Sequence, residues 1–152
     1  MLYVDAAARL VDGLRVVLCR RDLLDTSVSC LFQSFGPYYA FTDHPAWMGH
    51  AARSLSALMD RWRDRPPCAV HELVHETLLD DPEGELRRLL AFLDLPWDPA
   101  VLEFHRLDRE VHTASTAQVR EPLHRRAVGR GRRYLPWAQE LVAALEGGPA
   151  PG

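Results

Sequence analysis

Apolar and polar residues follow one another along the chain in blocks that predict two short strands separated by helices. Arg15–Cys19 contains four successive apolar residues, a pattern typical of a strand that is buried on both faces. Residues 69–74 form a second candidate strand after the break at Pro66-Pro67. Asp25 or Thr26 is expected to cap a helix that runs to about Phe35. Further helices are expected at 2–12, 46–63, from Asp81-Pro82-Glu83 to a stop at Pro96, 99–106 and 137–145, with loops at 38–45 and 111–131.

The alternation of strands and helices favours an α/β fold with a parallel sheet flanked by helices. We expect a single domain over residues 1–146, followed by a disordered tail at 147–152. The inner face of the helix at 46–63 is predicted from its apolar positions, which are Trp47, Leu55, Leu58, Met59 and Trp62.

The net charge, the cysteines and the lengths of the apolar runs each disfavour particular classes of protein. The formal net charge of −3 over 152 residues argues against a general nucleic-acid binder. The three cysteines indicate free thiols in a reducing cytosol, and therefore a cytoplasmic protein. We expect no association with a membrane, because no apolar run has the length of a membrane span and no signal pattern begins the chain.

An anion site is predicted where the first strand meets the following helix. Arg20 and Arg21 come directly after the apolar run, and Ser29 is expected on the first turn of the helix. A helix N-terminus carries unpaired N–H groups and the positive end of the helix dipole. Arginine adds a planar fork that binds two phosphate oxygens at once. The segment therefore predicts a bound phosphate, such as that of a nucleotide.

A competing motif is His71-Glu72-Leu73-Val74-His75, which spells H-E-x-x-H. On a helix this spacing presents two zinc ligands and a general base, as in zinc hydrolases. However, the motif follows Pro66-Pro67-Cys68-Ala69-Val70 as a strand would, and we favour two histidines at a strand end without a metal.

A basic segment near the C-terminus allows three interpretations. Residues 120–133 contain six arginines and a single acid, Glu121. They form a solvated loop, a nucleic-acid patch or a lid over an anionic small molecule. The nucleic-acid interpretation is disfavoured because only Tyr134 lies near to stack on a base.

Arg20–Ser29, His75–Pro82, Phe92–Trp97 and Ser115–Arg133 together resemble the C-terminal half of a sulfotransferase. The resemblance is to bacterial sulfotransferases often fused to tetratricopeptide repeats and to protein-tyrosine sulfotransferases. It implies a P-loop-kinase-like parallel sheet flanked by helices. It also implies transfer of a sulfuryl group from 3′-phosphoadenosine 5′-phosphosulfate (PAPS) to an acceptor hydroxyl or amine, the acceptor being a small molecule or a peptide.

The resemblance also implies donor-binding residues. Arg21 and Ser29 match the pair that holds the 3′-phosphate, and Arg130 matches a basic residue that closes over the donor phosphates. His75 stands at a donor-contact position where the family usually has tyrosine. The donor-binding loop is matched by Ser115, Gln118, Val119 and Arg120.

The chain departs from the family pattern at several places. Gly131 stands where tryptophan is common, and Leu23 where proline is usual. The Pro-x-Ser-Gly-Thr-Thr loop that cradles the phosphosulfate, with the catalytic base that follows it, does not precede Arg20. We therefore expect a truncated domain that is inactive alone and requires a chain supplying the N-terminal half. The alternative is a non-catalytic module for nucleotide binding or interaction.

Overall fold

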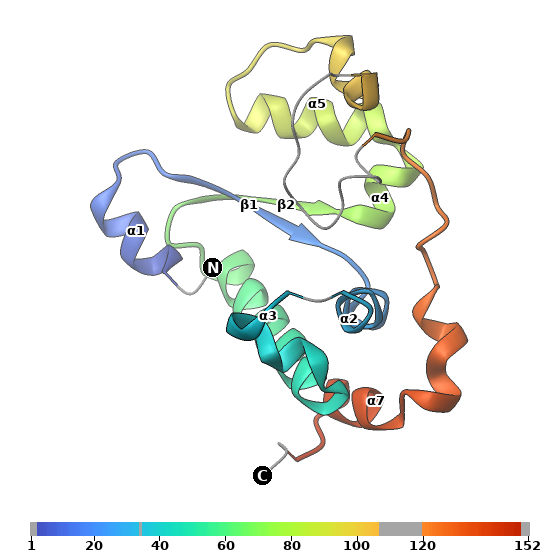
Figure 1. The fold of residues 1–152 in the computed structure, drawn as a ribbon. Coiled ribbons are helices and arrows are strands. Elements are labelled where there is room, and N and C mark those ends of the chain that lie inside the picture. The colour runs from blue at the N-terminus through green and yellow to red at the C-terminus, as the bar shows by residue number, and fades with distance from the viewer. Residues whose placement is uncertain (1–2, 34, 107–119, 150–152) are drawn as a thin grey trace. The chain divides into compact units, whose positions relative to one another are not determined.

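The computed structural model describes residues 3–33, 35–106 and 120–149 (Figure 1). The chain divides into two compact units, the first made of residues 1–20 and 67–125 and the second of 21–66 and 126–152. The first unit contains α1 (Val4–Leu10), β1 (Arg15–Arg20), β2 (Ala69–Val74), α4 (His75–Asp80), α5 (Pro82–Phe92) and the 3₁₀ helix η2 (Pro99–Arg106). The second contains α2 (Leu23–Leu31), α3 (Pro45–Asp64), α7 (Gln139–Leu145) and the 3₁₀ helices η1 (Pro37–Asp43) and η3 (Gly131–Trp137).

The first unit is built on a parallel pair of strands. β1 and β2 pair from Arg15 opposite Ala69 to Arg20 opposite Val74, which confirms both predicted strands and their parallel direction. The expectation that β1 is buried on both faces is wrong, because Leu18 is fully buried while Cys19 is exposed. Successive side chains point to opposite faces of a strand, so one face of β1 is covered more fully than the other.

Helix α5 begins as its sequence predicts. The Asp81 side chain accepts a hydrogen bond from the Gly84 N–H at 2.9 Å, and Pro82 occupies the first turn. Proline fits there because its missing N–H would have had no partner within the helix. α5 packs against β2 and α4 within the first unit (Figure 1).

The second unit has its core between α2, α3 and α7, at Val28, Met48, Ala52, Ala138 and Leu141. The prediction for α3 is correct at Met59 and Trp62, which are buried, and wrong at Trp47 and Leu55, which are 44% and 37% exposed. The buried face of α3 instead contains Met48 and Ala52, because α7 packs on that side.

Several boundaries also differ from the sequence prediction. Helix α2 ends at Leu31 rather than Phe35, and the expected loop at 38–45 largely forms η1. The predicted short helix at 99–106 is a 3₁₀ helix. Of the predicted loop at 111–131, residues 111–119 lie outside the described residues, and residues 120–130 form turns and irregular structure before η3 begins at Gly131. Among the helices that the structure describes, none is long and apolar enough to cross a membrane.

Candidate functional site

Two of the predicted site residues follow directly on the paired strands. Arg20 and Val74 are the last residues in register, so Arg21 and His75 come immediately after the carboxyl ends of β1 and β2. Ligands of open α/β sheets bind outside the carboxyl ends of the strands. Arg21 belongs to the second unit and His75 to the first.

The N-terminus of α2 is capped by Asp22. Its side chain accepts a hydrogen bond from the Asp25 N–H at 2.8 Å, so the expectation that Asp25 or Thr26 caps the helix is wrong. Because α2 therefore begins at Leu23, Ser29 lies about two turns into the helix rather than on its first turn. Ser29 is half-buried.

Arg21 has unused hydrogen-bonding capacity beside this helix. Its Nη2 atom donates to the Ala127 carbonyl at 3.0 Å, whereas its Nε atom is buried and has no hydrogen-bond partner. A buried donor without an acceptor costs about 1–3 kcal/mol, so such groups are uncommon. An anion near Arg21 would offer the acceptor that this guanidinium lacks, and the residue therefore fits a bound phosphate.

The charge of Arg21 acts on Cys30, in the last turn of α2. Burial raises the pKa of the Cys30 thiol, and the positive charge of Arg21 opposes that rise.

Asp25 is a site residue that the sequence prediction missed. Its side chain is buried and accepts hydrogen bonds from the N–H groups of Gly129 and Gly131, both at 2.6 Å. These two glycines flank Arg130. The available signals were the Asp22-x-x-Asp25 spacing and the Gly-Arg-Gly sequence, but nothing local connects them.

The segment at residues 127–131, which we call the arginine loop, requires its glycines. Gly129 has φ +71°, a conformation that favours glycine. Gly131 is buried, and a methyl group there would lie 2.7 Å from Cγ and 2.9 Å from the carbonyl carbon of Leu24. A side chain larger than that of glycine would not fit this arrangement.

Arg130 lies over the ring of Phe32, the residue that caps the C-terminus of α2. Its guanidinium carbon is 5.5 Å from the centre of the Phe32 ring, and Phe32 stands one helical turn beyond Ser29 on the same side. Tyr134 packs against Phe32 with 5.1 Å between ring centres. Arg21, Ser29 and Arg130 thus all belong to the second unit: Arg21 precedes α2, Ser29 lies on it and Arg130 lies beside its C-cap residue.

The H-E-x-x-H motif straddles a strand and a helix. His71 and Glu72 lie on β2, whereas His75 is the first residue of α4. Glu72 pairs with Arg20, and His71 stacks on Phe92 with 5.2 Å between ring centres. The helical spacing that a zinc hydrolase needs is thus not formed, and the described part of the chain holds no group of three or more residues that could bind a metal.

Of the remaining predicted residues, the structure describes only Arg120, which belongs to the first unit. Arg120 is exposed, at the start of the described segment from 120. Ser115, Gln118 and Val119 lie outside the described residues. Of the other arginines in the basic segment, Arg125 forms an exposed ion pair with Asp80.

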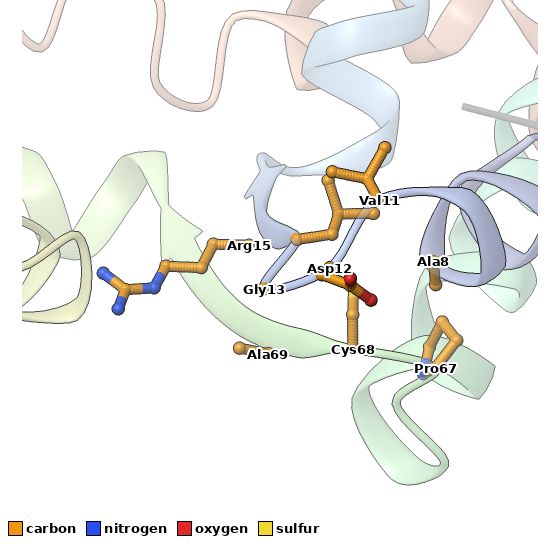
Figure 2. Close-up of a pocket in the computed structure, with 9 residues that line it drawn as sticks. Ala8, Val11, Asp12, Gly13, Arg15, Pro67, Cys68 and Ala69 are labelled. Carbon is orange, nitrogen blue, oxygen red and sulfur yellow. The ribbon is translucent and has the colours of Figure 1, made fainter.

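An open pocket of about 430 Å³ lies at the opposite, amino-terminal ends of β1 and β2 (Figure 2). Figure 2 shows the Arg15 side chain extending away from the other lining residues. None of the predicted site residues lines this pocket, so it is separate from the strand ends that carry them. Its lining is Ala8, Val11, Asp12, Gly13, Leu14, Arg15, Pro67, Cys68 and Ala69.

Comparison with known proteins identifies the family. Residues 1–99 match the model of the sulfotransferase family. An uncharacterized protein of Aquifex aeolicus (strain VF5) is 32% identical over 149 residues, which is 96% of this chain and 20% of that protein. The chain thus spans about a fifth of the length of this relative. No solved structure matches. The match over residues 1–99 shows that the chain belongs to the sulfotransferase family.

Proposed function

We propose that the chain binds the 3′-phosphate of PAPS and takes part in transferring its sulfuryl group to an acceptor hydroxyl or amine. Sulfotransferases generally use this donor. The observation that carries the proposal is the buried Nε of Arg21, which has no hydrogen-bond partner at the end of a parallel strand. Family membership supplies the chemical class of the ligand.

The recognition chemistry follows from charge. Arg21 would donate to phosphate oxygens from its guanidinium, and Ser29 would add a hydroxyl from the same helix. Arg130 would contribute a second positive charge from the arginine loop. Hydrogen bonds to charged groups contribute about 1.5–3 kcal/mol each, so losing Arg21 is expected to weaken binding by roughly 10- to 100-fold.

The transfer step requires more than these residues. Sulfuryl transfer resembles phosphoryl transfer, in which positioning and charge stabilisation dominate. Arg21, Ser29 and Arg130 would hold the non-reacting end of the donor. The Pro-x-Ser-Gly-Thr-Thr motif that cradles the reacting end is not in this sequence, and we assign no catalytic base. We therefore propose that transfer needs a segment or partner chain that carries this motif.

The fold supports the same proposal. The β1–β2 pair is parallel and its connection runs through helices, as in P-loop-kinase-like sheets. We propose that the pair is part of such a sheet.

The test is calorimetric titration of the chain with adenosine 3′,5′-bisphosphate, with adenosine 5′-monophosphate as the ligand control. We expect binding of the bisphosphate only, and a loss of roughly 10- to 100-fold in Arg21→Ala. Arg61→Ala on α3 is the matched control and should bind normally. Equal affinity for both nucleotides, or an unaffected Arg21→Ala variant, would contradict the proposal.

A second candidate is a non-catalytic nucleotide-binding module. The coding sequence upstream of Met1 discriminates between the two. A Ser-Gly-Thr-Thr loop there supports the transferase, whereas nucleotide binding without such a loop, in this chain or a partner, supports the module.

A further inference from the structure

A buried carboxylate in the second unit has no role in the chemistry described so far. Asp25 is only 3% exposed, and both of its oxygens are engaged by backbone N–H groups, Oδ2 by Gly129 and Oδ1 by Gly131. Removing a carboxylate from water costs on the order of several kcal/mol unless hydrogen bonds compensate it. Two short charge-assisted bonds, with the nearby helix N-terminus, provide that compensation.

The two bonds fix the residue between them. Gly129 and Gly131 are the immediate neighbours of Arg130, so the backbone on both sides of Arg130 is tied to Asp25. At the other end of the loop, Arg21 donates a hydrogen bond to the Ala127 carbonyl oxygen at 3.0 Å. The arginine loop is thus attached to the start of α2 at three backbone atoms, while the Arg130 side chain remains exposed beside Phe32.

We infer that Asp25 is a positioning residue that sets Arg130 for the phosphate of the donor. The inference rests on the proposed function and adds a requirement to it: Arg130 binds only when the loop is fixed to α2. Binding groups act at their best when neighbouring hydrogen bonds already hold them in place. Asp25 touches neither the nucleotide nor the reacting atoms in this scheme and acts through Arg130.

The decisive variant is Asp25→Asn, which keeps the shape of the side chain. The carboxamide has one acceptor oxygen and one NH₂ donor, so it can satisfy only one of the two N–H groups. We expect affinity for adenosine 3′,5′-bisphosphate to fall about tenfold, the equivalent of one charge-assisted bond. Asp22→Asn is the matched control, because asparagine caps a helix as well as aspartate does.

A double-mutant cycle separates positioning from general structural support. If Asp25 acts through Arg130, Asp25→Asn has no further effect on affinity in an Arg130→Ala background. A second loss of about tenfold in that background would overturn the inference. Gly131→Ala provides an independent variant, since its methyl group displaces the loop while leaving the carboxylate intact. It should weaken binding in the same way.

Nuclear magnetic resonance of the free chain tests the bonds without any ligand. The amide protons of Gly129 and Gly131 should exchange slowly with solvent, and Asp25→Asn should remove this protection from at least one of them. Unprotected amides in the unsubstituted chain would overturn the inference. Failure of the unsubstituted chain to bind the bisphosphate overturns the proposed function itself. Binding that Asp25→Asn leaves unchanged overturns only the role of Asp25.

Discussion

The Asp25 carboxylate accepts a hydrogen bond from the Gly131 N–H at 2.6 Å, although the two residues are 106 positions apart. This bond connects the first turn of α2 to the segment that carries Arg130. It accounts for a glycine at position 131, because the loop approaches Leu24 too closely for a side chain.

Gly131→Ala should destabilise the chain. The new methyl group would lie 2.7 Å from Leu24 Cγ, so either the side chain or the arginine loop must move. Overpacking of this kind typically costs about 1–3 kcal/mol. Urea unfolding followed by circular dichroism measures the loss, with the exposed Arg133→Ala as control. A midpoint equal to that of the unsubstituted chain would show that the loop does not pack on Leu24.

Asp81→Ala should destabilise α5 by about 1 kcal/mol, because the Gly84 N–H loses its acceptor. Asp81→Asn should retain most of the stability, since asparagine also caps. The comparison separates the cap from the exposed ion pair of Asp81 with Arg88, which should contribute little. Thermal unfolding measures both variants. Equal destabilisation by alanine and asparagine would assign the effect to charge instead.

Leu141→Ala should cost about 2–5 kcal/mol, because Leu141 is fully buried in the core of the second unit and its truncation leaves a cavity. Leu135→Ala is the control, since Leu135 is 42% exposed. Chemical denaturation gives the free energy of unfolding for both. A cost near zero for Leu141→Ala would contradict the packing of α7 on α3.

Cys30 should react with iodoacetamide more slowly than the exposed Cys19 at pH 8. Burial raises the pKa of the Cys30 thiol, so less reactive thiolate is present at that pH. Arg21→Ala removes a charge that lowers this pKa, and should therefore move the midpoint of the rate against pH further upward. Mass spectrometry of labelled peptides over pH 7–10 gives both profiles. A downward shift in Arg21→Ala would show that Arg21 does not act on Cys30.

Much of the secondary structure of the chain can be predicted from short stretches of sequence. The bounds of β2 and the start of α5 at Asp81-Pro82 follow from residues close together in the sequence. The parallel direction of the strands follows from the alternation of strands and helices. Strand patterns and helix caps depend on neighbours within about four positions, so the sequence displays them directly. The succession of motifs along the chain likewise predicted the sulfotransferase family.

The sequence predictions of burial fail where packing against distant segments decides which side chains are buried. Trp47 and Leu55 match an apolar helical stripe, yet α7 packs on Met48 and Ala52 instead. Cys19 continues an apolar run but lies on the less covered face of β1. In both cases the sequence contains the apolar pattern, but it does not show which distant segment packs on the element and so decides which face is buried.

The sequence by itself determined the strands, the cap of α5 and the family, because each has a local pattern. The resemblance to sulfotransferases named Arg21, Ser29 and Arg130 as candidates. Only the tertiary structure moved Asp25 from helix cap to acceptor for Gly129 and Gly131, and brought the arginine loop to α2. A carboxylate at the start of a helix has many possible donors. Which of them it binds depends on the packing of segments a hundred residues away. Because the carboxylate is buried, losing these donors would leave a charge without hydrogen bonds, at a high cost in free energy.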